Sequence, residues 1–253
     1  MRITTLFCLL CYPFLVIAGV IPENSRIIFH AKNALQSSVL VNTNPYPVVA
    51  QLWVDEGELN TDPEQAVSPF VVTPVISRMD PLKINEMKLI FSGEKNSLPA
   101  DRESLFWLNI LEVPPVNKNP ATENEVTLSM LTQVKILYRP ESLETNSHEL
   151  LAKLDALTFS AKKVNKNVLA LTVNNPTQYV ASLAAVSLLS QSGGSTVRSN
   201  PTGTPNFTLL PKSNNTFQFE HIQPSAGVDE IEYFLIDDSG KFFQRRQHVP
   251  VSQ

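Results

Sequence analysis

The sequence predicts an all-β protein that folds into two sandwich domains. Short apolar runs bounded by turn-forming residues recur along the whole chain, whereas helical periodicity is nearly absent. The chain also contains 19 prolines, which break helices and mark turns and strand edges. A polar stretch, residues 141–148, separates the runs into two series. Each series has roughly 100 residues, the usual size of an immunoglobulin-like sandwich, so we expect two immunoglobulin-like domains.

The first residues have the pattern of a secretory signal peptide. Arg2 is followed by a largely apolar run, Ile3 to Ile17, and small residues allow cleavage after Ala18. The run is shorter than the ~20 apolar residues of a membrane-spanning helix, and Pro13 interrupts it. We therefore expect residues 1–18 to be removed on export, with no stable membrane insertion of the mature chain.

The composition excludes several classes of protein. Both cysteines, Cys8 and Cys11, lie in the predicted signal peptide, so the mature chain has no disulfide and no thiolate metal site. Its stability must come from its two hydrophobic cores. The net charge of the whole chain is −4, which gives no electrostatic argument for nucleic-acid binding.

The strands of the first domain, residues 19–140, are predicted from the apolar runs between turn signals. We expect them at Arg26–Phe29, Gln36–Val41, Val48–Val54, Phe70–Val72, Glu86–Phe91 and Ser104–Leu111, followed by a long strand from Val126 to Pro140.

The long strand has more apolar surface than its own domain needs. Six apolar side chains lie at every second position and therefore share a face, interrupted only by Thr132: Val126, Leu128, Met130, Val134, Ile136 and Tyr138. The run is more than twice as long as a usual strand of about 5 to 6 residues. We expect that a group outside the domain covers this surplus apolar surface.

The second domain, residues 141–253, is predicted to begin with one short helix, Ser147–Leu157, before its own strands. We expect strands at Val168–Val173, Tyr179–Leu189, Phe207–Leu210, Thr216–Glu220, Ile231–Ile236 and Lys241–Val249. Residues 191–205 are rich in Gly, Ser, Asn and Pro, and we expect a loop there.

No motif for catalysis, nucleotide binding or metal binding is present in the sequence. The four histidines are scattered without ligand spacing, and the chain has no glycine-rich phosphate loop and no nucleophile elbow. We expect no cofactor, no metal and no enzymatic activity. A hydrolase that uses Asp101, Glu103 or Asp238 is a minor alternative without a catalytic constellation to support it.

Two basic residues are notable for their positions. Arg26 begins the first strand, and Lys135 lies within the long strand on the face opposite its apolar row. A lysine in the middle of a strand is usually solvated. The alternative is that Lys135 and Arg26 face a cleft and bind an anion, since charge-assisted hydrogen bonds to a carboxylate contribute about 1.5 to 3 kcal/mol each.

Several motifs resemble those of the periplasmic pilus-assembly chaperones of the chaperone/usher pathway, and together they span nearly the whole chain after residue 18. They are SRIIF at residues 25–29, NPYPVVAQLWVDEG at 44–57, FVVTPVISRMDP at 70–81, DRESLFWLNILEVPP at 101–115, VKILYRP at 134–140, NNPTQYVASLA at 174–184 and EIEYFLIDDSGK at 230–241.

The resemblance implies two immunoglobulin-like domains arranged as a boomerang with a cleft between them. It implies that Arg26 and Lys135 anchor the C-terminal carboxylate of a pilus subunit in that cleft. The residues that it assigns to the donor strand, which completes the subunit's sandwich, are Val126, Leu128 and Met130. It also implies a charged trio that joins the two domains, Glu103, Arg139 and Asp238, and a cis peptide bond at Thr73-Pro74.

The implied partners are pilus subunits and an outer-membrane usher, and the implied compartment is the periplasm. The short loop before Val126 and the lack of cysteine in the mature chain place the resemblance in the short-loop branch of the family. The resemblance leaves open a dimer in which the free protein covers its own exposed strand. A secreted structural pilus subunit or adhesin is the alternative function.

Overall fold

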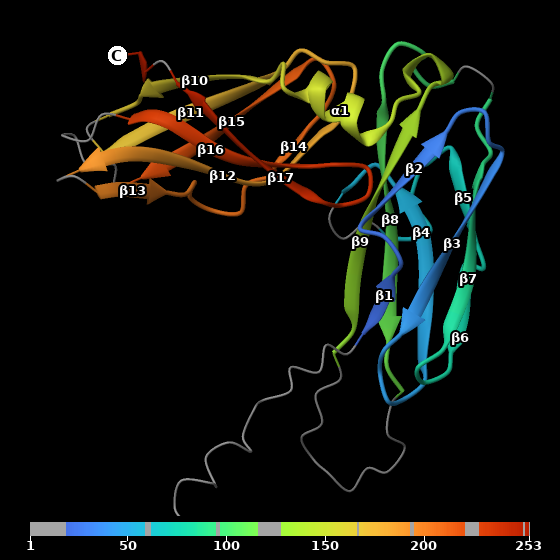
Figure 1. The fold of residues 1–253 in the computed structure, drawn as a ribbon. Coiled ribbons are helices and arrows are strands. Elements are labelled where there is room, and N and C mark those ends of the chain that lie inside the picture. The colour runs from blue at the N-terminus through green and yellow to red at the C-terminus, as the bar shows by residue number, and fades with distance from the viewer. Residues whose placement is uncertain are drawn as a thin grey trace, which may run out of the picture.

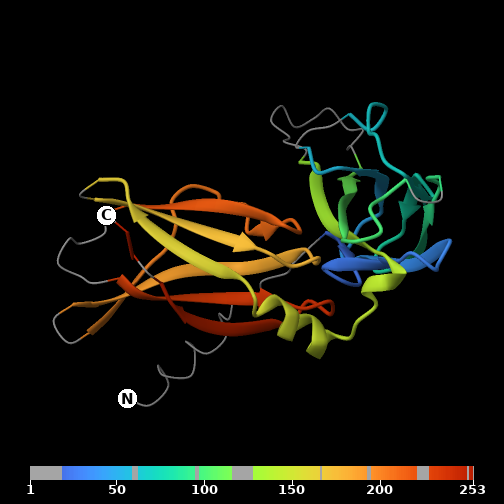
Figure 2. The same ribbon diagram turned by 90° about the horizontal axis from the view of Figure 1, so that it is seen from above.

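The computed structural model describes residues 19–58, 62–94, 97–115, 128–165, 167–192, 195–220, 228–249 and 251–252. The predicted signal peptide, residues 1–18, and Val126 lie outside these residues. The fold is almost entirely β and consists of two sandwiches that meet at one end of the first, which gives a boomerang outline (Figure 1). Seen from above, the second sandwich extends sideways from the first (Figure 2).

In the described part of the first sandwich, nine strands form two sheets. They are β1 (Val20–Pro22), β2 (Arg26–His30), β3 (Leu35–Asn42), β4 (Val48–Asp55), β5 (Phe70–Thr73), β6 (Ile76–Met79), β7 (Ile84–Phe91), β8 (Ser104–Val113) and β9 (Met130–Arg139). One sheet has the order β1-β3-β7-β5, and the other has the order β2-β9-β8-β4-β6. The Thr73-Pro74 peptide bond is cis.

The core of the first sandwich is built around five aromatic rings that the two sheets contribute. They belong to Phe29, Phe70, Phe91, Phe106 and Tyr138. The rings of Phe29 and Phe70 meet edge to face with centroids 5.0 Å apart, a favourable arrangement for aromatic pairs. Val134 and Ile136 of β9 are buried beside them, as the alternation of the long strand predicts.

The beginning of the chain passes from one sheet to the other between β1 and β2, and this passage positions the site described below. β1 pairs with β3, and after residues 23–25 the chain continues as β2, which pairs with β9 in the other sheet. β2 and β9 are parallel, with Arg26 opposite Lys135 and His30 opposite Arg139. The pairing begins only at Lys135, so β2 leaves the beginning of β9 uncovered.

β9 is shorter than the predicted long strand. It begins at Met130, and the prediction that Leu128 and Ser129 belong to the strand is wrong for the isolated chain. The ladder between β8 and β9 ends with the pair Glu112 and Met130. Beyond that pair β8 stops at Val113 because two prolines follow, and proline has no N–H with which to continue a ladder.

A 3₁₀ turn, Glu141–Leu143, and helix α1, Ser147–Leu154, connect the two sandwiches. The Asn146 side chain caps the helix by accepting a hydrogen bond from the Glu149 amide at 3.0 Å. The helix ends three residues before the predicted Leu157. Its buried residues Leu150, Leu151 and Leu154 belong to the core of the second sandwich, as does Leu143.

The second sandwich also has two sheets. Its strands are β10 (Thr158–Lys163), β11 (Val168–Asn175), β12 (Ala181–Ser192), β13 (Ser195–Ser199), β14 (Thr208–Leu209), β15 (Ser213–Glu220), β16 (Val228–Ile236), β17 (Phe242–His248) and β18 (Val251–Ser252). One sheet has the order β15-β11-β10-β18 and the other the order β13-β12-β16-β17, with β14 paired to β12. Phe159 and Tyr233 pack in the core with ring centroids 4.7 Å apart.

The prediction of a loop at residues 191–205 is wrong for its first part. β12 continues to Ser192, and β13 pairs with it from Ser195 to Ser199. The residues of β13 are largely exposed and carry no apolar alternation, so backbone hydrogen bonds with β12 define the strand.

Candidate functional site

Arg26 and Lys135 lie side by side where the two sandwiches meet. They are directly paired in the parallel ladder between β2 and β9, and paired residues of neighbouring strands project from the same face of a sheet. Arg26 is only 7% exposed, and Lys135 is half-buried. Among the residues that the structure describes, neither cation forms a salt bridge.

The ammonium group of Lys135 faces the second sandwich instead of open solvent. Its Nζ donates a hydrogen bond to Ser182 Oγ of β12 at 3.1 Å and lies 5.5 Å from the ring centroid of Trp107 on β8. Burial, together with the positive charge of Arg26, lowers the pKa of Lys135 to about 8. The reading of Lys135 as a solvated surface lysine is therefore wrong, because the second sandwich covers it.

Arg26 is held by β16, the strand of the second sandwich that pairs with β12. Its Nη1 donates a 3.4 Å hydrogen bond to the main-chain carbonyl of Ile236, at the end of β16. Its Nε is buried and has no hydrogen-bond partner. Burial lowers the pKa of Arg26, and the nearby charges of Asp238 and Asp237 oppose that shift. Two adjacent cations with unused hydrogen-bonding capacity form a site that favours an anion.

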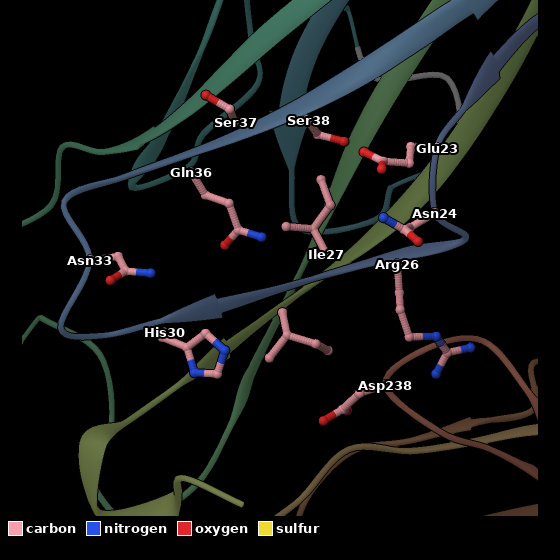
Figure 3. Close-up of a pocket in the computed structure, with 11 residues that line it drawn as sticks. Glu23, Asn24, Arg26, Ile27, His30, Asn33, Gln36, Ser37, Ser38 and Asp238 are labelled. Atoms are coloured by element: carbon pink, nitrogen blue, oxygen red, sulfur yellow. The ribbon is translucent and has the colours of Figure 1, made fainter. Parts of the chain in front are cut away.

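Arg26 also borders a pocket of about 320 Å³ between β2 and β3 (Figure 3). In this view Arg26 extends from β2 toward the turn that carries Asp238, whose carboxylate is directed away from it (Figure 3). On the other side of Lys135 a groove of about 660 Å³ lies between the sandwiches. Trp107 of the first sandwich and Asn206 and Leu210 of the second are among the residues that line this groove.

The beginning of β9 has one free edge next to this cation pair. Residues 130–134 pair with β8 on one side, and in the described part of the chain no strand pairs with their other side. Met130 is 44% exposed, and Leu128, just before the strand, is 79% exposed. Unpaired N–H and C=O groups beside exposed apolar side chains make a surface to which another strand can add.

The predicted charged trio is brought together at the junction of the sandwiches. Arg139 Nε donates to Glu103 Oε1 at 2.6 Å, and its Nη1 and Nη2 donate to the two carboxylate oxygens of Asp238 at 2.6 and 2.9 Å. Glu103 Oε2 accepts a 2.8 Å hydrogen bond from the amide of Val180. Glu103 and Arg139 belong to the first sandwich, and Asp238 and Val180 belong to the second.

Two members of the trio are deeply buried and Asp238 is 18% exposed, so the buried charges depend on their partners. The Arg139 side chain is 1% exposed and that of Glu103 is 0% exposed. Burial raises the pKa of Glu103, although the charge of Arg139 acts in the opposite direction. Burial would lower the pKa of Arg139, but its hydrogen bond to Asp238 and the charge of Glu103 raise it overall. The guanidinium therefore stays charged and holds both carboxylates.

The three acidic residues that were considered for a hydrolase have other roles. Glu103 and Asp238 bind Arg139, and Asp101 forms an exposed 2.6 Å ion pair with Lys212 of the second sandwich. Among the described residues, no group of three His, Cys, Asp or Glu side chains is placed to hold a metal ion. Within the same residues, no helix has the length and apolar character needed to cross a membrane.

The sequence prediction missed three groups of the site. Ser182 and the carbonyl of Ile236 belong to the second domain, and only the tertiary structure brings them to Lys135 and Arg26. Trp107 could have been found, because it lies on β8 on the side opposite the buried residues Phe106 and Leu108. The assignments of Leu128 and Met130 to a donor strand remain predictions, and Val126 lies outside the described residues.

Comparisons with known proteins agree with this architecture. Residues 19–144 match the family model described as pili and flagellar-assembly chaperone, PapD N-terminal domain, and residues 152–247 match pili assembly chaperone PapD, C-terminal domain.

Individual relatives align with this chain over most of their length. It is 31% identical to the chaperone protein FimB/FhaD of Bordetella pertussis over 225 aligned residues, and the alignment covers 88% of this chain and 85% of that protein. It is 32% identical to the chaperone protein MrkB of Klebsiella pneumoniae over 240 aligned residues, and the alignment covers 94% of this chain and 93% of that protein. The crystal structure of the Pseudomonas aeruginosa CupB2 chaperone matches with a TM-score of 0.69 and 28% identity, over 90% of this chain and all of that one. The chain therefore belongs to the PapD family of pilus-assembly chaperones.

Proposed function

We propose that this chain is a periplasmic chaperone that binds pilus subunits by donating the free edge of β9, anchors the subunit's C-terminal carboxylate at Arg26 and Lys135, and delivers the subunit to an outer-membrane usher. The observation that carries the proposal is the position of the cation pair. Arg26 and Lys135 meet where β2 stops covering β9 and the free edge begins. The signal-peptide pattern of residues 1–18 supports the periplasmic location.

This geometry sets the direction of the bound subunit strand. The free edge extends only from Lys135 toward Met130, so a strand whose last residue is at Lys135 must place its earlier residues beside Val134 to Met130. It therefore runs in the same direction as β9. β2 already pairs with β9 in a parallel ladder, and the subunit strand would continue the line of β2.

Apolar side chains before and at the beginning of β9 would then enter the subunit. Leu128 and Met130 are exposed in the isolated chain, and Val126 has the same alternation. Burial of each could contribute about 1.5 to 3 kcal/mol before the cost of ordering the segment. Main-chain hydrogen bonds would supply affinity, and the alternation of the side chains would set the register. In the free protein a second copy could cover the same edge and would compete with the subunit.

In this proposal the two domains have different tasks. Residues 19–140 form the domain that donates the strand, and residues 141–253 form the second wall of the cleft. The trio of Glu103, Arg139 and Asp238 joins them and fixes their relative orientation. The placement of Leu143 in the core of the second sandwich supports a boundary near Pro140.

Strand donation is tested by producing the chain together with a candidate pilus subunit and purifying the complex. We expect a one-to-one complex in which the amides of residues 130–134 that point away from β8 exchange with deuterium much more slowly than in the free chain. β13, an exposed edge strand of the second sandwich, serves as the control and should not change. A complex that forms without protection of residues 130–134 would contradict strand donation.

Carboxylate binding should depend on pH because the pKa of Lys135 in the free protein is about 8. Below that pH the ammonium is protonated and can bind a carboxylate. As the pH rises above it, the free protein loses this charge, so affinity should fall by up to about tenfold per unit until the pKa of the complex is reached. Titration calorimetry between pH 6 and 10 measures the effect. Lys135→Arg, whose guanidinium stays charged, is the control, and an equally steep fall in this variant would refute the role of Lys135.

The alternative of a structural pilus subunit or adhesin is not retained, because the chain matches both domains of the chaperone family.

A further inference from the structure

The turn between β16 and β17 is a rigid element that carries one side of the cation site. The Asp237 side chain is buried, and its Oδ1 accepts three hydrogen bonds, from the amide and hydroxyl of Ser239 and from the amide of Lys241. Two main-chain hydrogen bonds close the turn, from Asp237 to Lys241 and from Gly240 to Asp237. Such a turn has little freedom to adjust when a neighbouring group moves.

Gly240 brings this turn into close contact with the first sandwich. Its φ of +83° is in the region that favours glycine. A Cβ added to Gly240 would lie 2.7 Å from Ser25 Oγ and 3.9 Å from Ser25 Cβ, so the Ser25 hydroxyl or the turn would have to move. Ser25 directly precedes Arg26, so Gly240 brings the turn into contact with the beginning of β2.

The same turn touches Arg26 and Arg139. The carbonyl of Ile236, directly before the turn, accepts the hydrogen bond from Arg26 Nη1, and Asp238 within it binds Arg139 through both carboxylate oxygens. Figure 3 shows Arg26 extending toward this turn, with the Asp238 carboxylate directed away from it. Because Asp238 is occupied by Arg139, Arg26 depends on the main-chain carbonyl and on the close approach of the turn for its position.

We propose that Gly240 is a positioning residue for the carboxylate site: by allowing the β16–β17 turn to pack against Ser25, it holds the carbonyl of Ile236 against Arg26 and keeps the guanidinium aimed beside Lys135. The proposal rests on the function proposed above. An arginine side chain that lost this support would have to be ordered by the ligand, and the entropy of that ordering would reduce affinity.

The test compares two forms of one probe, an acetylated peptide of alternating Thr and Val that ends either in a free carboxylate or in an amide. The wild-type chain is expected to bind the carboxylate form roughly ten- to a hundredfold more tightly. In Gly240→Ala this ratio should fall several-fold, because Lys135 still binds the carboxylate, while the affinity for the amide form stays the same. A general loss of structure would weaken both forms.

Two further variants separate the contact with Ser25 from backbone strain. Ser25→Ala in the Gly240→Ala background removes the Oγ that the new methyl group meets, so the ratio should return toward that of the wild type. Gly203→Ala places alanine at a φ of +77° where nothing lies within 4 Å of the new Cβ, and it should leave the ratio unchanged. If Gly240→Ala does not fold, Ser25→Leu crowds the same contact without straining the turn and should also lower the ratio.

The outcomes distinguish this inference from the proposed function. Equal binding of both probe forms by the wild-type chain would overturn the carboxylate anchor itself. A wild-type ratio that persists in Gly240→Ala or in Ser25→Leu, or one that Ser25→Ala fails to restore, would overturn the role of Gly240 and leave the anchor in place.

Discussion

Lys135→Ala is expected to abolish productive binding of a pilus subunit. The variant removes one of two cations at the end of the free edge and leaves Ser182 and Trp107 facing an empty space. A buried charge-assisted bond to a carboxylate contributes about 1.5 to 3 kcal/mol, so affinity should fall roughly ten- to a hundredfold or more. A subunit produced together with this variant should aggregate or be degraded, which is measured as the yield of soluble one-to-one complex.

Lys88→Ala provides the matched control for this variant. Lys88 also lies within a strand of the first sandwich, but its side chain is exposed on β7, away from the junction. It should give the wild-type yield of complex. Arg26→Ala should resemble Lys135→Ala, since both cations would contact the same carboxylate. A wild-type yield with Lys135→Ala would contradict the anchor.

Arg139→Met is expected to give the largest loss of stability. The variant leaves the fully buried carboxylate of Glu103 with the amide of Val180 as its remaining hydrogen-bond donor. Removal of one partner from a buried ion pair costs about 3 to 5 kcal/mol, because the other charge stays buried without compensation. Both tryptophans, Trp53 and Trp107, lie in the first sandwich, so urea unfolding followed by tryptophan fluorescence measures the loss in the domain that contains Glu103.

The double variant Arg139→Met with Glu103→Gln distinguishes an uncompensated charge from a general packing defect. The glutamine has no charge, and its oxygen can still accept from the amide of Val180, so much of the lost stability should return. Lys212→Ala breaks the exposed ion pair with Asp101 across the same junction and should change stability very little. No recovery in the double variant would show that packing, and not charge, explains the loss.

The sequence predicted the strands that build the two cores, because their alternation reflects burial on one face. It missed the short strands β1, β6, β10 and β18, and it assigned β13 to a loop. β1 and β6 have three and four residues, too few to show a period, and prolines interrupt their surroundings. The residues of β13 are largely exposed, and backbone pairing with β12, not an apolar pattern, defines this strand.

The site was predictable only in part, because several of its contacts form between the two sandwiches. The family motifs located Arg26, Lys135 and the three residues of the trio, and the structure brings the trio into contact. Ser182, the carbonyl of Ile236 and the contact of Gly240 with Ser25 depend on how one sandwich packs against the other. A backbone carbonyl carries no signal in residue type, and a glycine or serine does not reveal which residue it will contact. The sequence therefore located the charged residues of the junction but not the contacts that form across it.

The parallel pairing of β2 with β9 has a practical consequence for the design of client proteins. Beyond Lys135 the edge of β9 is already occupied by β2 from Arg26 to His30. In the complex proposed above, a subunit fused at its C-terminus to an affinity tag or a fluorescent protein would need to continue through that occupied space, and it would also lack the terminal carboxylate. Tags on clients of this chaperone should therefore be placed at the N-terminus or in a surface loop.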